Sequence, residues 1–167
     1  RELVSNTGTI NVNDGIGIKL EGATLHTNQN TGIINVNGDD GVGIKVNDFS
    51  SITNNGLINV TRAGTGIYAT EYSSITNYGD INIADGTGIL LDMYSGLINY
   101  ATLNVTEGGR GIAGYNATIV NDATGMITTS RSSQTASARS LNRSLDLSDA
   151  AIYADHSVVS NIGGITA

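Results

Sequence analysis

Cysteine, proline and tryptophan are all absent from this chain of 167 residues. Because proline removes a backbone donor and is excluded from central strands, its absence suits a protein in which almost every strand has two neighbours. The absence of cysteine is compatible with a reducing cytosol, and equally with a secreted chain that must stay unfolded during export. The cysteine content therefore leaves the compartment open.

Positively charged residues are few, with eight lysines and arginines against fifteen aspartates and glutamates and a net charge of −7. Without a basic stripe the surface offers little to phosphates, which predicts that the protein does not bind nucleic acid. No run of about 18 apolar residues occurs, so we expect no membrane-spanning segment. The sequence begins at Arg1 without an initiator methionine or an export leader, and we expect it to be part of a longer protein.

One short sequence motif recurs through the first 105 residues. Its first copy is Gly-Thr-Ile-Asn-Val at residues 8–12, and related copies begin at Gly32, Gly56, Gly79 and Ala101, so that the repeat is 22 to 24 residues long. Fainter copies follow at residues 125–127 and 163–165. A fixed period in this range is typical of a solenoid, whose units bury their apolar faces against one another.

Within each repeat, apolar and polar residues alternate over short stretches that are separated by glycine-containing turns, which predicts strands and not helices. Three strands per repeat, each stacked on its counterpart at about 4.8 Å, form a right-handed three-sided parallel β-helix, or β-solenoid. We therefore expect an all-β fold of six to seven coils, in which residues 1–167 form a single β-helix segment of a longer chain.

Aligning the repeats predicts which side chains fill the interior. The first strand contributes two interior columns, which are Ile10, Ile34, Ile58, Ile81, Leu103 and Ile127, and then Val12, Val36, Val60, Ile83 and Val105. The asparagines between the two columns, such as Asn35 and Asn59, are expected on the surface. The second strand contributes Ile18, Ile44, Ile67, Ile89, Ile112 and Ile152. The third segment contributes Leu25, Ile52, Ile75, Leu97, Ile119 and Val158.

A second kind of column consists of asparagines just before the first strand of each repeat. Stacked amides can donate and accept along such a column and can satisfy backbone groups in the turns, so we interpret it as a structural ladder. A role in reading a sugar is the alternative interpretation. The members of the column are Asn6, Asn30, Asn54, Asn77, Asn99, Asn121 and Asn161.

The repeat is interrupted once, between Gly125 and Gly163, which lie 38 residues apart. The surplus is residues 130–147, which we expect to form a loop insertion protruding from the sixth coil. Insertions in solenoids leave from one side and often carry the binding feature. This one carries Arg131, Arg139 and Arg143, whose guanidinium groups suit a carboxylate or sulfate on a glycan or protein partner. A tolerated loop without a binding role is the alternative.

Aromatic residues also align. Phe49, Tyr72 and Tyr94 lie three residues before the apolar residue of the third segment in successive coils, and Tyr78 and Tyr100 follow the asparagine column. Aromatic rings stacked one strand spacing apart stabilise the edge of a solenoid. The same rings could contact the apolar face of a sugar, so structural stacking and partner binding both remain open for the first three.

The sequence does not predict an enzyme. Polysaccharide-degrading β-helices need two or three carboxylates, or a Ca²⁺ with a neighbouring base, that converge on one face. Here Asp14, Asp40 and Asp85 fall in turns, where aspartate caps its own backbone, and His26 and His156 lie in non-equivalent coils. We therefore expect no catalytic residues, no metal and no cofactor, and we keep a polysaccharide-degrading enzyme as a less favoured alternative. A dependence on calcium stays open.

The repeat resembles the passenger domains of large type V autotransporters, in particular those of fusobacterial outer-membrane adhesins. Residues 51–68 and 74–89 carry the resemblance best, through Ser-Ile-Thr-Asn-x-Gly followed by Gly-x-Gly-Ile. It extends more loosely over residues 4–123. The chain departs from the pattern at Ala101, at Thr128 and in the insertion.

The resemblance implies a location and a function. The passenger would be displayed on the bacterial cell surface, anchored in the outer membrane through a part of the chain not present here, or secreted. It would act as a virulence-associated adhesin that binds a glycan or protein on host or bacterial cells, as a monomer continuous with further coils. The alternative is a purely structural stalk that spaces a binding site located elsewhere in the parent chain.

Overall fold

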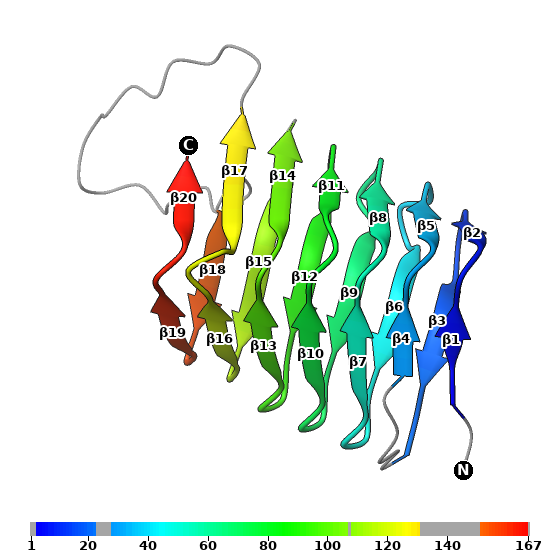
Figure 1. The fold of residues 1–167 in the computed structure, drawn as a ribbon, viewed down its shortest axis with the longest axis horizontal. Coiled ribbons are helices and arrows are strands. Elements are labelled where there is room, and N and C mark those ends of the chain that lie inside the picture. Colours follow the sequence, from blue (N-terminus) through cyan, green and yellow to red (C-terminus); the bar gives the residue numbers. More distant parts are fainter. Residues whose placement is uncertain (1–2, 23–27, 107, 131–150, 167) are drawn as a thin grey trace.

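The computed structural model describes residues 3–22, 28–106, 108–130 and 151–166, and every element in this part of the chain is a β-strand. The strands form three sheets that wrap around one interior, as Figure 1 shows. Neighbouring strands pair in parallel in all three sheets. The all-β, three-sided parallel β-helix that the repeat predicts is therefore confirmed.

Each of the first six coils contributes one strand to each sheet, and the last described coil contributes one strand to sheet A and one to sheet B. Sheet A contains β1 (Ser5–Asn6), β4 (Asn28–Asn30), β7 (Ser51–Asn54), β10 (Ser74–Asn77), β13 (Gly96–Asn99), β16 (Thr118–Asn121) and β19 (Val158–Asn161). Sheet B contains β2 (Thr9–Val12), β5 (Ile33–Val36), β8 (Leu57–Val60), β11 (Ile81–Ile83), β14 (Thr102–Thr106), β17 (Met126–Ser130) and β20 (Gly164–Thr166). Sheet C contains β3 (Ile16–Leu20), β6 (Val42–Val46), β9 (Thr65–Ala69), β12 (Thr87–Leu91), β15 (Arg110–Tyr115) and β18 (Ile152–Asp155).

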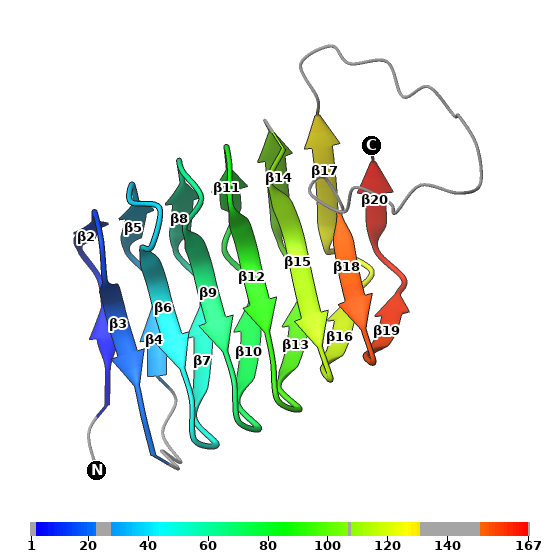
Figure 2. The same cartoon turned by 180° about the vertical axis from the view of Figure 1, so that it is seen from behind.

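The coil is right-handed. In Figure 1 the strands of sheet A lie on the near side and point upward while the coils advance from right to left. Seen from behind in Figure 2, the strands of sheet C point downward while the coils advance from left to right. Crossovers of this hand follow from the right-handed twist of the strands.

The interior columns of sheets B and C match those that the repeat predicts. Ile34, Ile58 and Ile81 are stacked in register and have no exposed surface. Full burial of one such side chain stabilises the fold by about 1.5–3 kcal/mol. Because side chains alternate along a strand, Asn35 and Asn59 lie on the outer face of sheet B, as expected.

The predicted column of sheet A is wrong at its two ends. Val159, and not Val158, pairs with Ile119, and Asn28 holds the position opposite Ile52. The reason is that the ladder asparagine sets the register: the inward positions are that asparagine and the residue two before it. Leu25, which the alignment places in this column, lies outside the described residues.

Glycine recurs at the second position of the sheet C strands because no side chain fits there. A Cβ on Gly43 would lie 2.6 Å from the carbonyl oxygen of Gly66 and 3.1 Å from Cγ2 of Ile34. The same approach to the next coil recurs at Gly88, whose Cβ would lie 2.7 Å from the carbonyl oxygen of Gly111. The glycine column therefore allows neighbouring coils to pack closely.

Candidate functional site

The buried asparagine column forms a continuous ladder of hydrogen bonds. The Nδ2 atom of each asparagine from Asn6 to Asn121 donates to Oδ1 of its counterpart in the next coil, at 2.7 to 2.8 Å. Asn54 also donates to the carbonyl oxygen of Gly56, and Asn99 to that of Ala101, so the alanine that replaces glycine keeps this contact.

The ladder is closed to ligands along most of its length. Its five central members, from Asn30 to Asn121, have no exposed surface. Because a sugar cannot reach these amides, their burial favours the structural interpretation of the column over a sugar-reading one. The amides of Asn54, Asn99 and Asn121 also satisfy a backbone carbonyl of the turn that follows, in place of water.

A second asparagine ladder, which the sequence reasoning missed, runs along the outer face of sheet B. Asn35 donates from Nδ2 to Oδ1 of Asn11 at 2.9 Å, and Asn59, Asn82 and Asn104 continue the series at 2.9 to 3.0 Å. Its amides donate toward the N-terminus, whereas those of the buried ladder donate toward the C-terminus. The signal was present as the asparagine inside each Ile-Asn-Val phrase.

The aromatic residues Phe49, Tyr72 and Tyr94, here called the aromatic ridge, stack in the turns between sheets C and A. Their ring centroids lie 5.1 and 5.2 Å apart, with planes inclined by 4° and 18°. The three side chains are 64%, 57% and 66% exposed. The structure therefore brings the three predicted residues together as one exposed stack, in which Tyr72 has a ring against each of its faces.

The backbone of the aromatic ridge is strained. Phe49, Tyr72 and Tyr94 have φ angles of 60°, 59° and 64°, and the residue before each of them also has a positive φ. Bulky residues rarely adopt this left-handed conformation, which costs on the order of 1–3 kcal/mol for each residue. A column of hydrogen bonds holds the turns in place, because the N–H of Phe49 donates to the carbonyl of Glu71, and that of Tyr72 to the carbonyl of Met93, both at 3.0 Å.

Two acidic residues lie beside one end of the aromatic ridge. Asp48 and Glu71 occupy equivalent positions in successive turns, just before Phe49 and Tyr72. A hydrogen bond between the two side chains, together with desolvation and the charge of Asp48, raises the pKa of Glu71. Met93, half-exposed, holds the next position of the column. The surface beside the ridge thus changes from acidic to apolar along the axis.

A second aromatic stack lies at the other end of the sheet A strands. The rings of Tyr78 and Tyr100 have centroids 4.7 Å apart and planes inclined by 8°. Burial alternates from exposed Tyr72 through strand β10 to exposed Tyr78, so both residues follow the outward pattern of that strand. The outer face of sheet A is therefore bounded by an aromatic stack at each end of β10 and β13.

Segment 130–147, which the sequence predicts to be a binding loop, begins at the last residue of strand β17. Ser130 is the last residue of β17 and pairs with Thr106 of β14. The remainder of segment 130–147, with Arg131, Arg139 and Arg143, lies outside the described residues. The expectation that these arginines bind a carboxylate or sulfate therefore stays a prediction.

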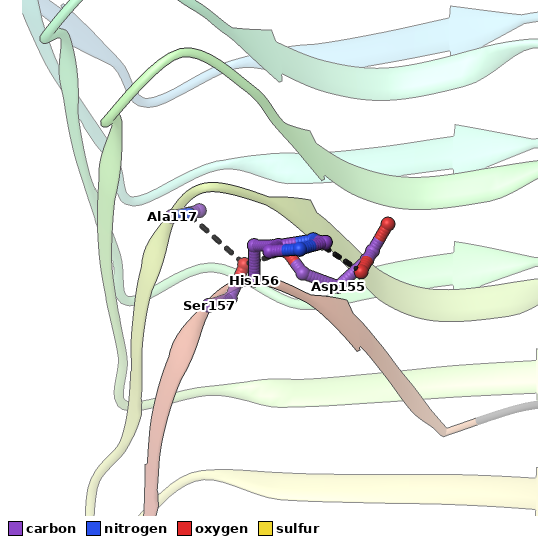
Figure 3. Close-up of polar contacts among 4 residues, drawn as sticks. All are labelled: Ala117, Asp155, His156 and Ser157. Carbon is purple, nitrogen blue, oxygen red and sulfur yellow. Dashed lines mark hydrogen bonds and ion pairs between the residues drawn. The ribbon is translucent and has the colours of Figure 1, made fainter.

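Consecutive Asp155, His156 and Ser157 bring together the residue types of a hydrolytic triad, but not its geometry, as Figure 3 shows. Nδ1 of His156 lies 2.7 Å from Oδ1 of Asp155. The Ser157 hydroxyl donates to the backbone carbonyl of Asp155 at 2.8 Å and accepts the N–H of Ala117 at 2.9 Å. Since the hydroxyl is engaged with backbone groups and not with the imidazole, this arrangement caps a turn and does not activate a nucleophile.

The depressions on the surface of the described coils include the following two. The larger, about 390 Å³, follows the outer face of sheet B, and we call it the sheet B groove. Its lining consists of Asn35, Asn59, Val60, Thr61, Asn82, Ile83, Ala84, Asn104 and Thr106. The smaller, about 260 Å³, lies at turns between sheets B and C and includes Asp85 and Arg110. Within the described ranges, no cluster of three histidine, aspartate or glutamate side chains could hold a metal ion.

Comparisons of the chain with known protein families, with curated proteins and with solved structures find no match. Across the part of the chain that the structure describes, no helix has the length and apolar character that would let it cross a membrane.

Proposed function

We propose that this β-helix is a segment of a surface-displayed adhesin passenger, which binds a glycan or protein on host or bacterial cells. The observation that carries the proposal is the aromatic ridge, where three large rings are held exposed on a left-handed backbone. Strained conformations persist where the surrounding structure imposes them, and they cluster at binding sites. The resemblance of the repeat to autotransporter passengers supplies the cellular setting: the bacterial surface, or secretion from it.

The geometry of the stack favours a protein partner at the aromatic ridge. A sugar stacks on the face of a ring, but both faces of Tyr72 are occupied by Phe49 and Tyr94. All three aromatic residues nevertheless remain more than half exposed, next to half-exposed Met93. Tyrosine, phenylalanine and methionine are enriched at the centres of protein interfaces, where an apolar body and a polar tip are both useful.

A structural stalk is the second candidate, and the buried ladder favours it. Asn6 to Asn161 are joined without a break, so the coils form one continuous hydrogen-bonded rod. Such a rod could space a binding site carried elsewhere in the parent chain. In this case the aromatic ridge serves only to brace the turns against one another.

A cell-binding assay with the labelled protein tests these alternatives. Replacing Phe49, Tyr72 and Tyr94 together by asparagine removes the rings but retains a residue type that tolerates a positive φ. The matched control, Tyr78→Ser with Tyr100→Ser, removes the other stack. We expect bacterial or host cells to bind the wild type and the control, and to bind the triple variant at least about tenfold more weakly.

Other outcomes assign the function elsewhere. Loss of binding only when Arg131, Arg139 and Arg143 are changed to alanine would keep the adhesin and move its contact to the insertion. Absence of binding by the folded wild type would favour the stalk. Hydrolysis of a surface glycan would contradict both.

A further inference from the structure

The sheet B groove has a floor of neutral, regularly repeated hydrogen-bonding groups. Asn35, Asn59, Asn82 and Asn104 present one amide per coil. An asparagine amide has two N–H donors and an oxygen that accepts twice. Within the ladder Asn59 donates once to Asn35 and accepts once from Asn82, which leaves one donor and one acceptor for a ligand.

One side of the groove repeats with the coil, as its floor does. Thr61 and Ala84 directly follow strands β8 and β11, and Thr106 is the last residue of β14. The two threonine hydroxyls donate to backbone carbonyls of the preceding coil. An occupant that runs along the axis meets one asparagine for every strand spacing of about 4.8 Å.

We propose that the sheet B groove binds a neutral, linear β-linked hexose chain lying along the solenoid axis. A hexopyranose unit in an extended β-1,4-linked chain advances by slightly more than one strand spacing, and successive units are turned over, so alternate sugars present the same hydroxyl edge to the asparagine column. Sugar hydroxyls both donate and accept, as the free amide positions do. The groove lining carries no charged side chain and the chain has a net charge of −7, which favours a neutral glycan over a sulfated or carboxylated one.

This glycan site is separate from the proposed protein contact. The aromatic ridge lies in the turns between sheets C and A, whereas the groove lies on sheet B. The two proposals therefore fail independently, and the glycan site does not depend on the adhesin function.

Titration with defined oligosaccharides tests the site. The probes are hexamers of β-1,4-linked glucose, mannose and N-acetylglucosamine, with the monosaccharides and a heparin hexasaccharide as controls. We expect at least one neutral hexamer to bind, monosaccharides to bind far more weakly because they meet one asparagine, and the heparin fragment not to bind. Binding of heparin in preference to every neutral hexamer would overturn the proposal.

A pair of valine substitutions locates the binding. Asn59→Val with Asn82→Val removes two amides and keeps good strand formers, whereas Thr53→Val with Thr76→Val makes the same kind of change on the outer face of sheet A. We expect the first pair to weaken binding at least about tenfold and the second pair to leave it unchanged. Equal affinity of the two pairs, or loss only in the aromatic ridge variant, would overturn the site.

A spectroscopic readout on the unaltered protein covers the case in which the asparagine variant does not fold. The side-chain amide signals of Asn59 and Asn82 are expected to shift on addition of the hexamer, while those of buried Asn54 and Asn77 stay in place. Shifts confined to other surfaces, or no shift with any neutral hexamer, would count against the groove.

Discussion

Asn54 donates a hydrogen bond from its side-chain Nδ2 to Oδ1 of Asn77 at 2.8 Å, and neither side chain has any exposed surface. The two residues belong to successive coils, so this contact connects strands that lie 23 residues apart in the sequence. Water cannot replace the bond if one partner is lost. The stability of the rod should therefore depend on each buried amide.

We expect Asn77→Leu to destabilise the protein strongly. It removes the partner of one N–H of the Asn54 amide and the side-chain donor to Oδ1 of Asn99, at a cost of about 1–3 kcal/mol for each buried group. The control is Asn59→Thr on the outer ladder, where water can reach the freed groups and where Thr128 already occupies the same column. Urea unfolding should give a much smaller loss for the control. Equal losses would contradict the structural role of the buried ladder.

The left-handed turns predict an unusual order of stability among variants at Tyr72. Asparagine tolerates a positive φ, whereas a β-branched residue does not, so Tyr72→Val should be less stable than Tyr72→Asn although valine is more apolar. Both variants also lose stacking that contributes about 0.5–1.5 kcal/mol for each ring pair. The unfolding free energies of the two variants, measured under the same conditions, check the order. A valine variant as stable as the asparagine variant would show that the turn relaxes.

Replacement by alanine should have different effects on stability at two glycines, Gly43 and Gly96. Gly43→Ala places a Cβ against the backbone of the next coil, so we expect a clear fall in melting temperature. A Cβ on Gly96 would have no atom within 4 Å, and Gly96→Ala should leave stability unchanged or raise it by about 0.4–1 kcal/mol. Thermal melts of the two variants test the close approach of coils in sheet C. Similar melting temperatures would contradict it.

The carboxyl pair beside the aromatic ridge predicts a pH dependence. The pKa of Glu71 is raised in the folded state, chiefly by its hydrogen bond with Asp48, so folding favours the protonated form. This contribution to stability is present below the unfolded-state pKa of about 4.3 and is lost as pH rises through the folded-state pKa. Glu21 acts in the opposite sense, because its hydrogen bond with Lys19 lowers its pKa, and its contribution is lost as pH falls.

Replacing Glu71 by glutamine isolates this effect. Glu71→Gln should be more stable than the wild type near neutral pH and should lose the advantage as the pH falls through the pKa of Glu71. Midpoints of urea unfolding, measured for both proteins between about pH 3 and pH 7, give the comparison. A difference that does not change with pH would show that the two carboxyls do not interact.

The repeat predicted the β-helix and most of its interior because both depend only on spacing. Ile34, Ile58 and Ile81 recur with the coil, and alternation along a strand then assigns Asn35 and Asn59 to the outside. Spacing also aligned Phe49 with Tyr72 and Tyr94. The alignment by spacing was wrong at Val158, because it matched apolar residues, whereas the hydrogen bond between Asn121 and Asn161 sets the register of the strand.

The sequence by itself therefore determined the period, the three-sided coil and the residues that share a column. The tertiary structure alone decided how the members of each column meet. The opposite directions of the two asparagine ladders, the occupied faces of Tyr72 and the groove beside Asn59 and Asn82 all depend on the orientation of side chains one coil apart. That orientation arises only when the coils stack, since residues separated by a full repeat have no local contact that fixes it.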